Sequence, residues 1–337
     1  MAKNDNWIVI TSINPPSEAI AKYSNLSNWT TIVIGDVTTP KIWEKTTLDL
    51  IYLSFADQQK LRYKLAKIIP EKSYMRKMLG YLYAIEHGAK VIVDTDDDNI
   101  PTDEWESQWK TSSLDMIDYT NGEWINTYKL HGAKKAWPRG LPLDTLMNPS
   151  KFTISKKRIG KRMLGVIQGL ANGDPDVDAI YRLTNNKSVY FKKRANQLVL
   201  SEGSLTPINS QNTHFDKKFF QLLYLPVTVT FRSTDIIRGY VAQPILWGEN
   251  ALLGIANAGV IQVRNPHNYL DDFKSEVPIF LDARKIGELA KISVKKEVGI
   301  SKNMIACYDA YINANIVDSS DMKYLNAWLE DLQDIMR

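Results

Sequence analysis

The sequence predicts an α/β fold built on a doubly wound, mostly parallel sheet with flanking helices. Short apolar segments alternate with amphipathic segments along residues 7–94, and this strand–helix–strand order is typical of such sheets. The segment at residues 90–94 is apolar without polar alternation, which favours a parallel strand covered on both faces. The length of 337 residues and the hydrophobic content of 44% are those of an ordinary globular protein.

Four apolar segments are predicted to be strands. They are WIVITSI (7–13), TTIVIGD (30–36), LIYLS (50–54) and KVIVD (90–94). In a doubly wound sheet, ligands bind beyond the carboxyl ends of the strands. Polar residues that follow these four segments are therefore the first candidates for a functional site.

The segments between the strands predict helices. Pro15 and Pro16 end the first strand, and Ser17 can cap a short helix after it. Residues 54–69 also read as a helix, with Ser54 as its N-cap.

Residues 71–89 give the clearest helical pattern. Its apolar side chains share one face at helical spacing, and they are Tyr74, Met78, Tyr81, Leu82 and Ile85. Gly88 suits the left-handed position that ends a helix.

Beyond residue 105 the pattern is less regular. Residues 251–263 and 277–282 have the character of a strand or of a buried helix. Residues 304–316 and 320–336 read as two amphipathic helices. We therefore expect a C-terminal helical extension after the α/β part.

Aspartates fill four of the five positions 94–98, directly after an apolar strand. Such charges repel one another strongly without a counter-charge. Hard divalent cations prefer carboxylate oxygens, and Asp96 and Asp98, at alternate positions, could reach a metal and a ribose. A calcium EF-hand is excluded because Asn99 stands where its turn needs glycine and Trp105 where its bidentate glutamate belongs. A phosphatase with an aspartate nucleophile and a solvated acidic loop are the remaining alternatives.

Composition limits the partners. The net charge of +4 is too balanced to predict nucleic-acid binding, although a local basic patch for phosphate or for a peripheral membrane contact stays open. Cys307 is the only cysteine, which excludes a disulfide framework and a thiolate metal cluster. No apolar stretch has the length of a membrane span, so we expect a cytoplasmic protein. The oligomeric state stays open.

Several motifs occur in a fixed order along residues 7–275: VITSINPPSEAI, VIGDVTTP, IPEKSYMRKMLGYLYAIEHGAKVIVDTDDDN, WPRGLPL, DVDAIYRLT and FRSTDIIRGYVAQPILW. Together they closely resemble the STELLO-type glycosyltransferase-like family. That family in turn is distantly similar to reversibly glycosylated polypeptides and UDP-arabinopyranose mutases. The resemblance implies a GT-A fold over residues 1–275, with a nucleotide-binding half at about 1–105 and an acceptor half at about 106–275. Residues 276–337 would be the helical extension.

The resemblance also assigns the acidic cluster. The triple acid of the mutase-like proteins falls on Asp96, Asp97 and Asp98. Enzymes of the GT-A type use such acids, in a DXD motif, to hold Mn²⁺ or Mg²⁺ on the diphosphate of a nucleotide sugar. A diphosphate cannot approach four carboxylates unless a cation bridges them. We therefore expect Asp96 and Asp98 to bind the metal, and Asp96 and Asp97 to lie at the nucleotide.

Other nucleotide contacts are expected near the strand ends. Thr11 and Ser12 lie at the end of the first strand and Asp36 ends the second, and all three could meet the base or the ribose. Arg76 and Lys77 precede the metal strand and offer charge to phosphate.

The acceptor half supplies further candidates. Trp137 and Arg139, in WPRGLPLD, are expected at a sugar, since an indole face suits a sugar ring. Asp178 and Arg182, in DVDAIYR, are candidate sugar or acceptor ligands, with Asp178 as a second catalytic candidate. Asp174 and Asp176 stand beside Gly173 and Pro175, and we expect them to be turn residues.

Asp235 and His267 complete the set. Asp235 lies in the first turn of a helix predicted to open at Ser233 or Thr234, where the helix dipole favours an acid. In GT-A enzymes that invert the sugar, an acid at such a place often acts as the base, so we assign that role to Asp235. His267 stands where many of these enzymes return a third metal ligand.

The sequence and its resemblance therefore predict a metal-dependent glycosyltransferase of inverting type that uses a UDP-sugar, with an unknown glycan, lipid or small-molecule acceptor. A sugar-nucleotide mutase and a catalytically silent scaffold for other glycosyltransferases are the alternatives.

Overall fold

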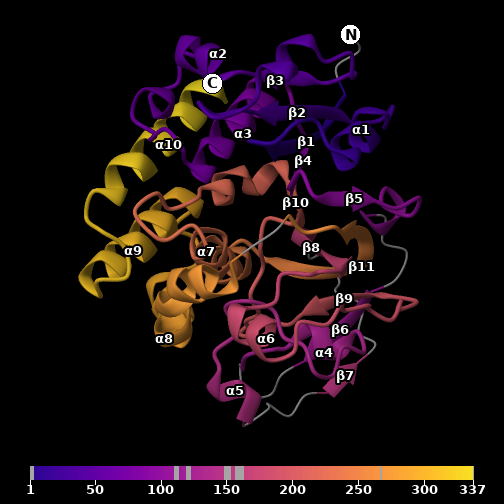
Figure 1. The fold of residues 1–337 in the computed structure, drawn as a ribbon. Helices are drawn as coiled ribbons and strands as arrows, with labels where there is room; N and C mark the ends of the chain where they lie inside the picture. Colours follow the sequence, from indigo (N-terminus) through magenta and orange to yellow (C-terminus); the bar gives the residue numbers. More distant parts are fainter. Residues whose placement is uncertain are drawn as a thin grey trace.

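The computed structural model describes residues 4–109, 114–118, 123–147, 153–155, 163–265 and 268–336. Its centre is one mixed sheet with the strand order β3-β2-β1-β4-β10-β8-β11-β9-β6-β7, and β5 pairs with β11 beside this path (Figure 1). The strands are β1 (Asn6–Thr11), β2 (Thr30–Ile34), β3 (Ile51–Leu53), β4 (Val91–Thr95), β5 (Asn99–Pro101), β6 (Leu114–Asp118), β7 (Thr153–Ser155), β8 (Met163–Gly173), β9 (Gln197–Leu200), β10 (Asn212–Asp216) and β11 (Ala251–Gln262).

The first four strands form a parallel block. β1 lies between β2 and β4, and β3 pairs with β2. The side chains of β1, β2 and β4 are almost entirely buried, as expected for β-branched strands covered on both faces. β10 then pairs antiparallel with β4 and with β8, and it joins this block to the strands of the second half.

The helices of the first half lie on the parallel block. They are α1 (Glu18–Ser24), α2 (Phe55–Lys60) and α3 (Lys77–Glu86), with the 3₁₀ turns η1 (Lys41–Lys45), η2 (Leu65–Lys67) and η3 (Tyr74–Arg76). The 3₁₀ turn η4 (Ser107–Trp109) follows them and contacts β11. α3 packs on β1 and β2. Gly80 allows this approach, because a Cβ there would lie 2.7 Å from Val9 Cγ1 and 2.8 Å from Ile34 Cγ1.

The remaining helices belong to the second half and the C-terminal end. They are α4 (Thr127–Leu130), α5 (Asp144–Met147), α6 (Ala179–Thr184), α7 (Thr234–Gly248), α8 (Tyr269–Ser293), α9 (Ile300–Asn313) and α10 (Asp321–Ile335), with the 3₁₀ helix η5 (Lys217–Leu223). α7 packs on β11, and α8 packs on α6, α7 and α9. α10 returns to the first half, where it contacts α3 and η2 (Figure 1).

The predicted α/β class is confirmed, with its parallel block, flanking helices and C-terminal helices. All four predicted strands of the first half are present. Ser17 and Ser54 cap their helices as predicted, accepting from the amides of Ile20 and Asp57. Gly88 has the expected left-handed backbone, with φ of +91°.

Two helices differ from their predicted extent. The predicted helix 54–69 is α2 followed by η2, with extended backbone at Leu61. The predicted helix 71–89 begins as the 3₁₀ turn η3 and is α-helical only from Lys77. Residues 277–282, read as strand or helix, lie inside α8, while residues 251–262 are the strand β11. Within the described residues, no helix is long and apolar enough to cross a membrane.

Candidate functional site

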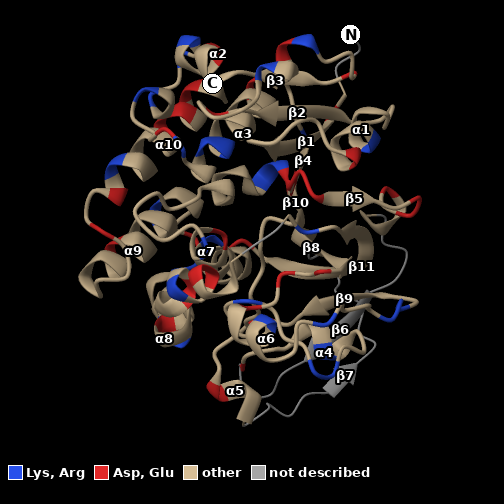
Figure 2. Cartoon of the chain, in the orientation of Figure 1, with Lys and Arg blue, Asp and Glu red and all other residues tan. Residues whose placement is uncertain are grey.

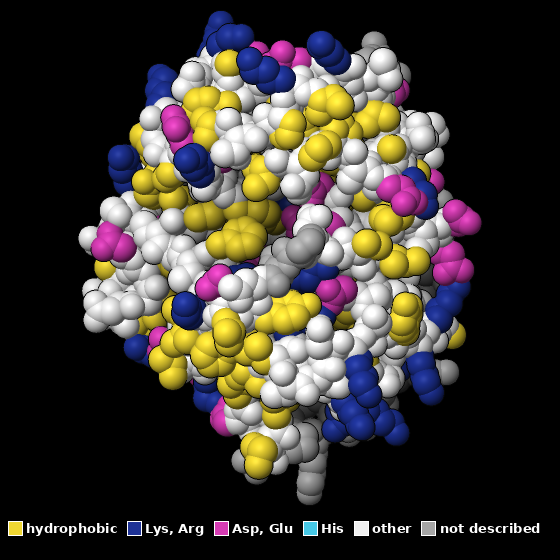
Figure 3. All heavy atoms as spheres, in the orientation of Figure 1, with side chains coloured by type: hydrophobic (Ala, Val, Ile, Leu, Met, Phe, Trp, Pro, Cys, Tyr) yellow, Lys and Arg dark blue, Asp and Glu magenta, His cyan; other side chains and the backbone are white. Residues whose placement is uncertain are grey.

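A cavity of about 880 Å³ opens at the carboxyl ends of β1, β2 and β4. Residues just beyond these three strands line it, as the doubly wound topology requires. The opposite wall comes from residues 227–235 and 262–265. Figure 3 shows the hollow near the centre of one face, with acidic side chains at its edge. The acidic turn after β4 lies in the middle of the molecule, between its two halves (Figure 2).

Asp94 is the buried member of the acidic turn, and two cations neutralise it. Lys77 Nζ lies 2.6 Å from Asp94 Oδ1, and Arg238 Nη1 lies 2.7 Å from Oδ2. All three side chains are buried. Burial opposes the charged form, but the two cations together hold the pKa of Asp94 below its usual value. Asp94 is therefore a structural carboxylate with its own counter-charges.

Asp97 is also held within the protein. Its Oδ2 accepts from Ser12 Oγ at 2.5 Å and from Asn14 Nδ2 at 3.1 Å. Its backbone carbonyl accepts from Ser17 Oγ at 2.5 Å. These bonds fix the acidic turn on the loop that follows β1.

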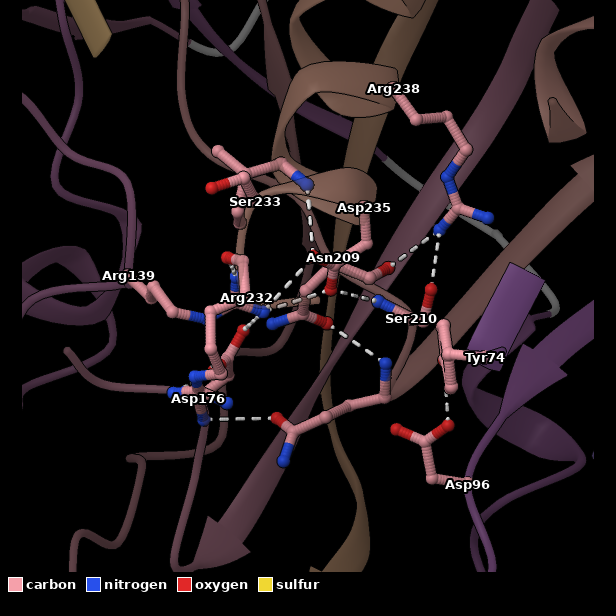
Figure 4. A network of polar contacts seen from close by, with 12 residues as sticks. Tyr74, Asp96, Arg139, Asp176, Asn209, Ser210, Arg232, Ser233, Asp235 and Arg238 are labelled. Carbon is pink, nitrogen blue, oxygen red and sulfur yellow. Dashed lines mark hydrogen bonds and ion pairs between the residues drawn. The ribbon is translucent and has the colours of Figure 1, made fainter. Parts of the chain in front are cut away.

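Asp96 and Asp98 are less fully compensated. Asp96 Oδ1 accepts from Lys77 Nζ at 2.9 Å. It also accepts from Tyr74 Oη at 2.8 Å (Figure 4). Asp98 Oδ2 accepts from Gln262 Nε2 at 3.0 Å. Burial raises the pKa of Asp96, and burial together with the charge of Asp96 raises the pKa of Asp98 to about 7. Both carboxylates line the cavity.

This pair fits a divalent cation. In the part of the chain that the structure describes, no three His, Cys, Asp or Glu side chains are grouped as a complete metal site. Mg²⁺, however, is usually held by one or two carboxylates, with phosphate oxygens and waters as the other ligands. Asp96 and Asp98 supply the two carboxylates, and the raised pKa of Asp98 reflects a charge that a cation would stabilise. His267, the predicted third ligand, lies outside the described residues.

Thr11, Ser12 and Asp36, the predicted contacts of the base or the ribose, all line the cavity. Both carboxylate oxygens of Asp36 accept hydrogen bonds within the protein, from the amides of Lys72 at 3.0 Å and Ser73 at 2.9 Å. It therefore shapes the cavity wall at residues 70–76.

Arg76 and Lys77 are both committed to internal partners. Arg76 Nε donates to Gln58 Oε1 at 2.8 Å, and its Nη1 donates to the carbonyls of Ile69 and Pro70. Arg76 reaches the cavity wall, whereas Lys77 does not line it. The predicted phosphate contact of Lys77 is replaced by its ion pairs with the acidic turn.

In the acceptor half, Arg139 joins two acids at the cavity. Its Nε and Nη2 donate to the two oxygens of Asp176 at 2.8 and 2.7 Å, and Nη2 also lies 3.1 and 2.9 Å from the oxygens of Asp235. Ser210 N donates to Asp235 Oδ2 at 3.2 Å. Figure 4 shows these groups converging from separate segments of the chain. Asp176, expected to be a turn residue, is thus part of the cavity wall.

Asp178, Trp137 and Arg182 do not line this cavity. Asp178 Oδ1 caps α6 by accepting from Tyr181 N at 2.9 Å, and its Oδ2 accepts from Trp137 Nε1 at 2.6 Å. Arg182 pairs with Asp174 and donates to the carbonyl of Pro175 at 2.6 Å. In this structure the three predicted sugar or acceptor contacts hold α6 in place.

Sequence reasoning missed Arg232, Arg238, Arg264 and Phe231. Arg238 stands one helical turn after Asp235 in the same motif, which is a signal that could have been used. Arg232 and Arg264 line the cavity, and Phe231, at its edge, is 53% exposed and packs on Tyr74. Phe231 and Arg232 open the same motif, so the same signal applied to them, whereas nothing in its local sequence distinguishes Arg264.

The chain is similar to known proteins along nearly its whole length. Residues 232–336 match the family model of the STELLO glycosyltransferases. The chain is 28% identical over 354 residues to the probable glycosyltransferases STELLO2 and STELLO1 of Arabidopsis thaliana. The alignments cover 98% of this chain but 45% and 44% of those proteins, so the chain spans less than half of their length. The predicted resemblance to the STELLO family is confirmed.

Two solved structures show a weaker likeness. One is described as a mycobacterial protein, with 10% identity, coverage of 87% of this chain and 76% of the other, and a TM-score of 0.39. The other is a glucosyl-3-phosphoglycerate synthase of M. tuberculosis, with 8% identity, coverage of 87% and 82%, and a TM-score of 0.35. Scores of this size carry no conclusion about this chain.

Proposed function

We propose that this relative of the STELLO glycosyltransferases is itself a metal-dependent glycosyltransferase that uses a nucleotide sugar, with a UDP-sugar as the donor. One observation carries the proposal. Asp96 and Asp98 line the cavity at the end of β4, while Asp94 beneath them is neutralised by Lys77 and Arg238. Two carboxylates of the turn, those of Asp96 and Asp98, are therefore available to a ligand in the cavity.

Asp96 and Asp98 would hold Mg²⁺ or Mn²⁺. When bound, such an ion neutralises the diphosphate and acts as a Lewis acid toward the departing nucleoside diphosphate. The protein contributes the orientation of the two carboxylates. Tyr74 and Lys77 fix Asp96, and Gln262 fixes Asp98.

The donor would lie along the wall formed by residues 11–14, 34–38 and 70–76. Asp36 holds the amides of Lys72 and Ser73, which sets the shape of this wall. The wall combines apolar side chains, among them Ile13, Ile34 and Met75, with the hydroxyl groups of Ser12, Thr38 and Ser73, and such a mixture suits a nucleoside.

Asp235 stays the predicted base, and its surroundings constrain that role. Arg139 donates to both of its oxygens, so a proton from the acceptor must reach a lone pair that these charge-assisted bonds leave open. Asp235 must also be within hydrogen-bond reach of the acceptor hydroxyl. The inverting outcome depends on this base and stays a prediction with it.

The test is calorimetry with UDP, in Mg²⁺ and in EDTA. We expect UDP to bind tightly only with the metal, because the carboxylates would otherwise repel the diphosphate. Asp96→Asn and Asp98→Asn each remove one metal ligand and should abolish the metal effect. Asp103→Asn makes the same chemical change at an exposed position outside the cavity and should leave it intact.

The same samples separate the alternatives. Equal UDP affinity in Mg²⁺ and EDTA would contradict the metal site. Failure to bind UDP, GDP or their sugars in either condition would favour the silent scaffold. Isomerisation of a bound UDP-sugar without any added acceptor would favour the mutase.

A further inference from the structure

The wall of the cavity opposite the nucleotide side carries guanidinium groups. Arg139, Arg232 and Arg264 all line the cavity there, with the exposed amide side chain of Asn265. The side chains of Arg232 and Arg264 are only 9% and 7% exposed. Buried cations of this kind need partners, and their partners decide what else they can bind.

Arg139 and Arg232 both form ion pairs with acidic side chains. Arg139 pairs with Asp176 and with Asp235. Arg232 Nη2 and Nε lie 2.7 and 2.8 Å from Glu276 Oε1, on α8. Glu276 does not line the cavity, whereas Asp176, whose Oδ1 lies 3.6 Å from Arg232 Nη2, does.

Arg264 is less well satisfied. Its Nη2 donates to Asp272 Oδ2 at 3.2 Å, and its buried Nε has no hydrogen-bond partner among the described residues. A buried donor without a partner is costly, and more so on a charged group. Asp272 lies outside the cavity lining as well.

The acids near Arg264, Asp176 and Asp272, only partly offset its burial and the neighbouring positive charge. Burial and the nearby charge of Arg232 lower the pKa of Arg264. Burial and the charge of Arg264 likewise lower the pKa of Arg182 to about 10. An anion beside Arg264 would relieve both effects.

We propose that Arg264 and Arg232, with Asn265, form a subsite for an anionic group of the acceptor, a carboxylate or a phosphate. This inference rests on the proposed function, because it names the acceptor class of the same cavity. Planar guanidinium groups suit both anions through paired hydrogen bonds. Asp176 and Asp235 share this wall, but both are paired with Arg139.

The position of the subsite favours the acceptor over the donor. Val263 N donates to the carbonyl of Asp98 at 3.0 Å, which ties the segment carrying Arg264 to the metal turn. Arg232 lies across the cavity from the nucleotide side, directly before α7. An anion held between them would lie next to the metal-bound diphosphate but outside the nucleoside wall, where an acceptor must lie to meet the sugar.

The experiment titrates inorganic phosphate into the full chain saturated with UDP and Mg²⁺. With the diphosphate site filled, phosphate should bind at the subsite. Arg264→Gln removes the charge and keeps an amide, and it should weaken phosphate binding by about 10- to 100-fold. The affinity for UDP with Mg²⁺ should change by less than about threefold. Arg264→Lys keeps the charge and should recover part of the phosphate affinity.

Arg62→Gln is the matched control, since Arg62 is exposed and lies outside the cavity. Weaker UDP binding in Arg264→Gln would assign this guanidinium to the donor diphosphate and overturn the proposal. Phosphate binding that is absent, or unchanged in Arg264→Gln, would overturn it too. If the chain binds no UDP at all, the proposed function is wrong. Titration of phosphate into the wild type and Arg264→Gln without nucleotide then still tests whether the anion subsite exists.

Discussion

Lys77 and Arg238 are the side chains that allow so many carboxylates at the end of β4. Both are buried, and each makes an ion pair with a different oxygen of Asp94. Lys77 Nζ also contacts Asp96 Oδ1, the carbonyl of Thr95 and Tyr74 Oη. Removal of one partner from such a group leaves uncompensated charge in the interior.

Lys77→Met tests this compensation. The stem of methionine fills similar space, but Asp94 and Asp96 lose their shared cation. We expect the free energy of unfolding to fall by about 3–5 kcal/mol, the usual cost of breaking a buried pair, as measured by urea denaturation. Lys60→Met is the control, because Lys60 pairs with Asp57 at the surface, and it should cost less than about 1 kcal/mol. A similar small change for Lys77→Met would mean that the acidic turn does not need this cation.

From the raised pKa of Asp178 we expect the stability of the protein to depend on pH. Its side chain is buried, and burial raises its pKa to about 6 in the folded state, against about 4 in an unfolded chain. The folded state therefore binds more protons between these two values, so this residue lowers stability as pH rises from about 4 to 6.

Asp178→Asn removes that titration. The amide oxygen can still cap α6, while the bond from Trp137 is lost at every pH. Relative to this variant, the wild type should lose about 3 kcal/mol between pH 4 and pH 7, from a shift of about two pKa units. Urea denaturation at the two pH values measures it, with Asp103→Asn as the exposed control. A constant difference between wild type and Asp178→Asn would show that folding does not shift the pKa of Asp178.

Among the elements, local pattern predicted the parallel block well. The strands and their caps depend on short-range features, namely apolar runs and serine side chains, and those were found where expected. The break in the predicted helix 54–69 depends on the other end of the chain. Asp331, on α10, accepts from the amides of Lys64 at 2.8 Å and Leu65 at 2.9 Å and so caps η2. No local pattern could predict this.

In the candidate site, too, features set by local sequence were predicted and features set by distant residues were not. The acidic turn was visible in the sequence and does line the cavity. The partner of Asp94 on α7 is 144 residues away, and the role of Asp178 as a cap depends on its backbone geometry. Sequence reasoning therefore found the carboxylates but not the cations that determine which of them are free.

The segment between η5 and α7 is an element whose shape depends on α10. Buried Asp321 accepts from Val227 N at 2.9 Å, Thr228 N at 2.7 Å and Tyr224 Oη at 2.5 Å. This segment then runs on to Phe231 and Arg232 at the cavity. Asp321 thus positions part of the acceptor wall from outside it.

Asp321→Ala should disturb that wall. Loss of the carboxylate leaves buried donors unpaired, and we expect destabilisation of at least about 2 kcal/mol. Hydrogen exchange should show faster exchange of the amides of residues 224–233, while amides of β1 stay protected. Asp309→Ala, at an exposed position of α9, is the control. Unchanged exchange in residues 224–233 would show that Asp321 does not hold the segment.

At the scale of the whole molecule, the C-terminal helices pack against the rest of the chain. α10 packs on α3 and η2 of the first half and on η5 of the second. Trp328 is fully buried between them, near the ring of Tyr81, and its Nε1 donates to the carbonyl of Gln221 at 2.9 Å. The predicted boundary at residue 275 stays a prediction, and these contacts give it a physical test.

Trp328→Ala provides that test. Truncation of a buried tryptophan costs about 3–5 kcal/mol. Because its contacts join α10 to both halves, we expect one cooperative unfolding transition in wild type and variant, with the variant shifted as a whole. Hydrogen exchange should then speed up equally for the most protected amides of β1, β4 and α9. Leu281→Ala, at a side chain that is 77% exposed, should shift nothing. If residues 276–337 were instead an independent unit, Trp328→Ala would produce an early transition confined to α9 and α10. The amides of β1 and β4 would then keep their wild-type protection, because their stability would not depend on a side chain of the extension.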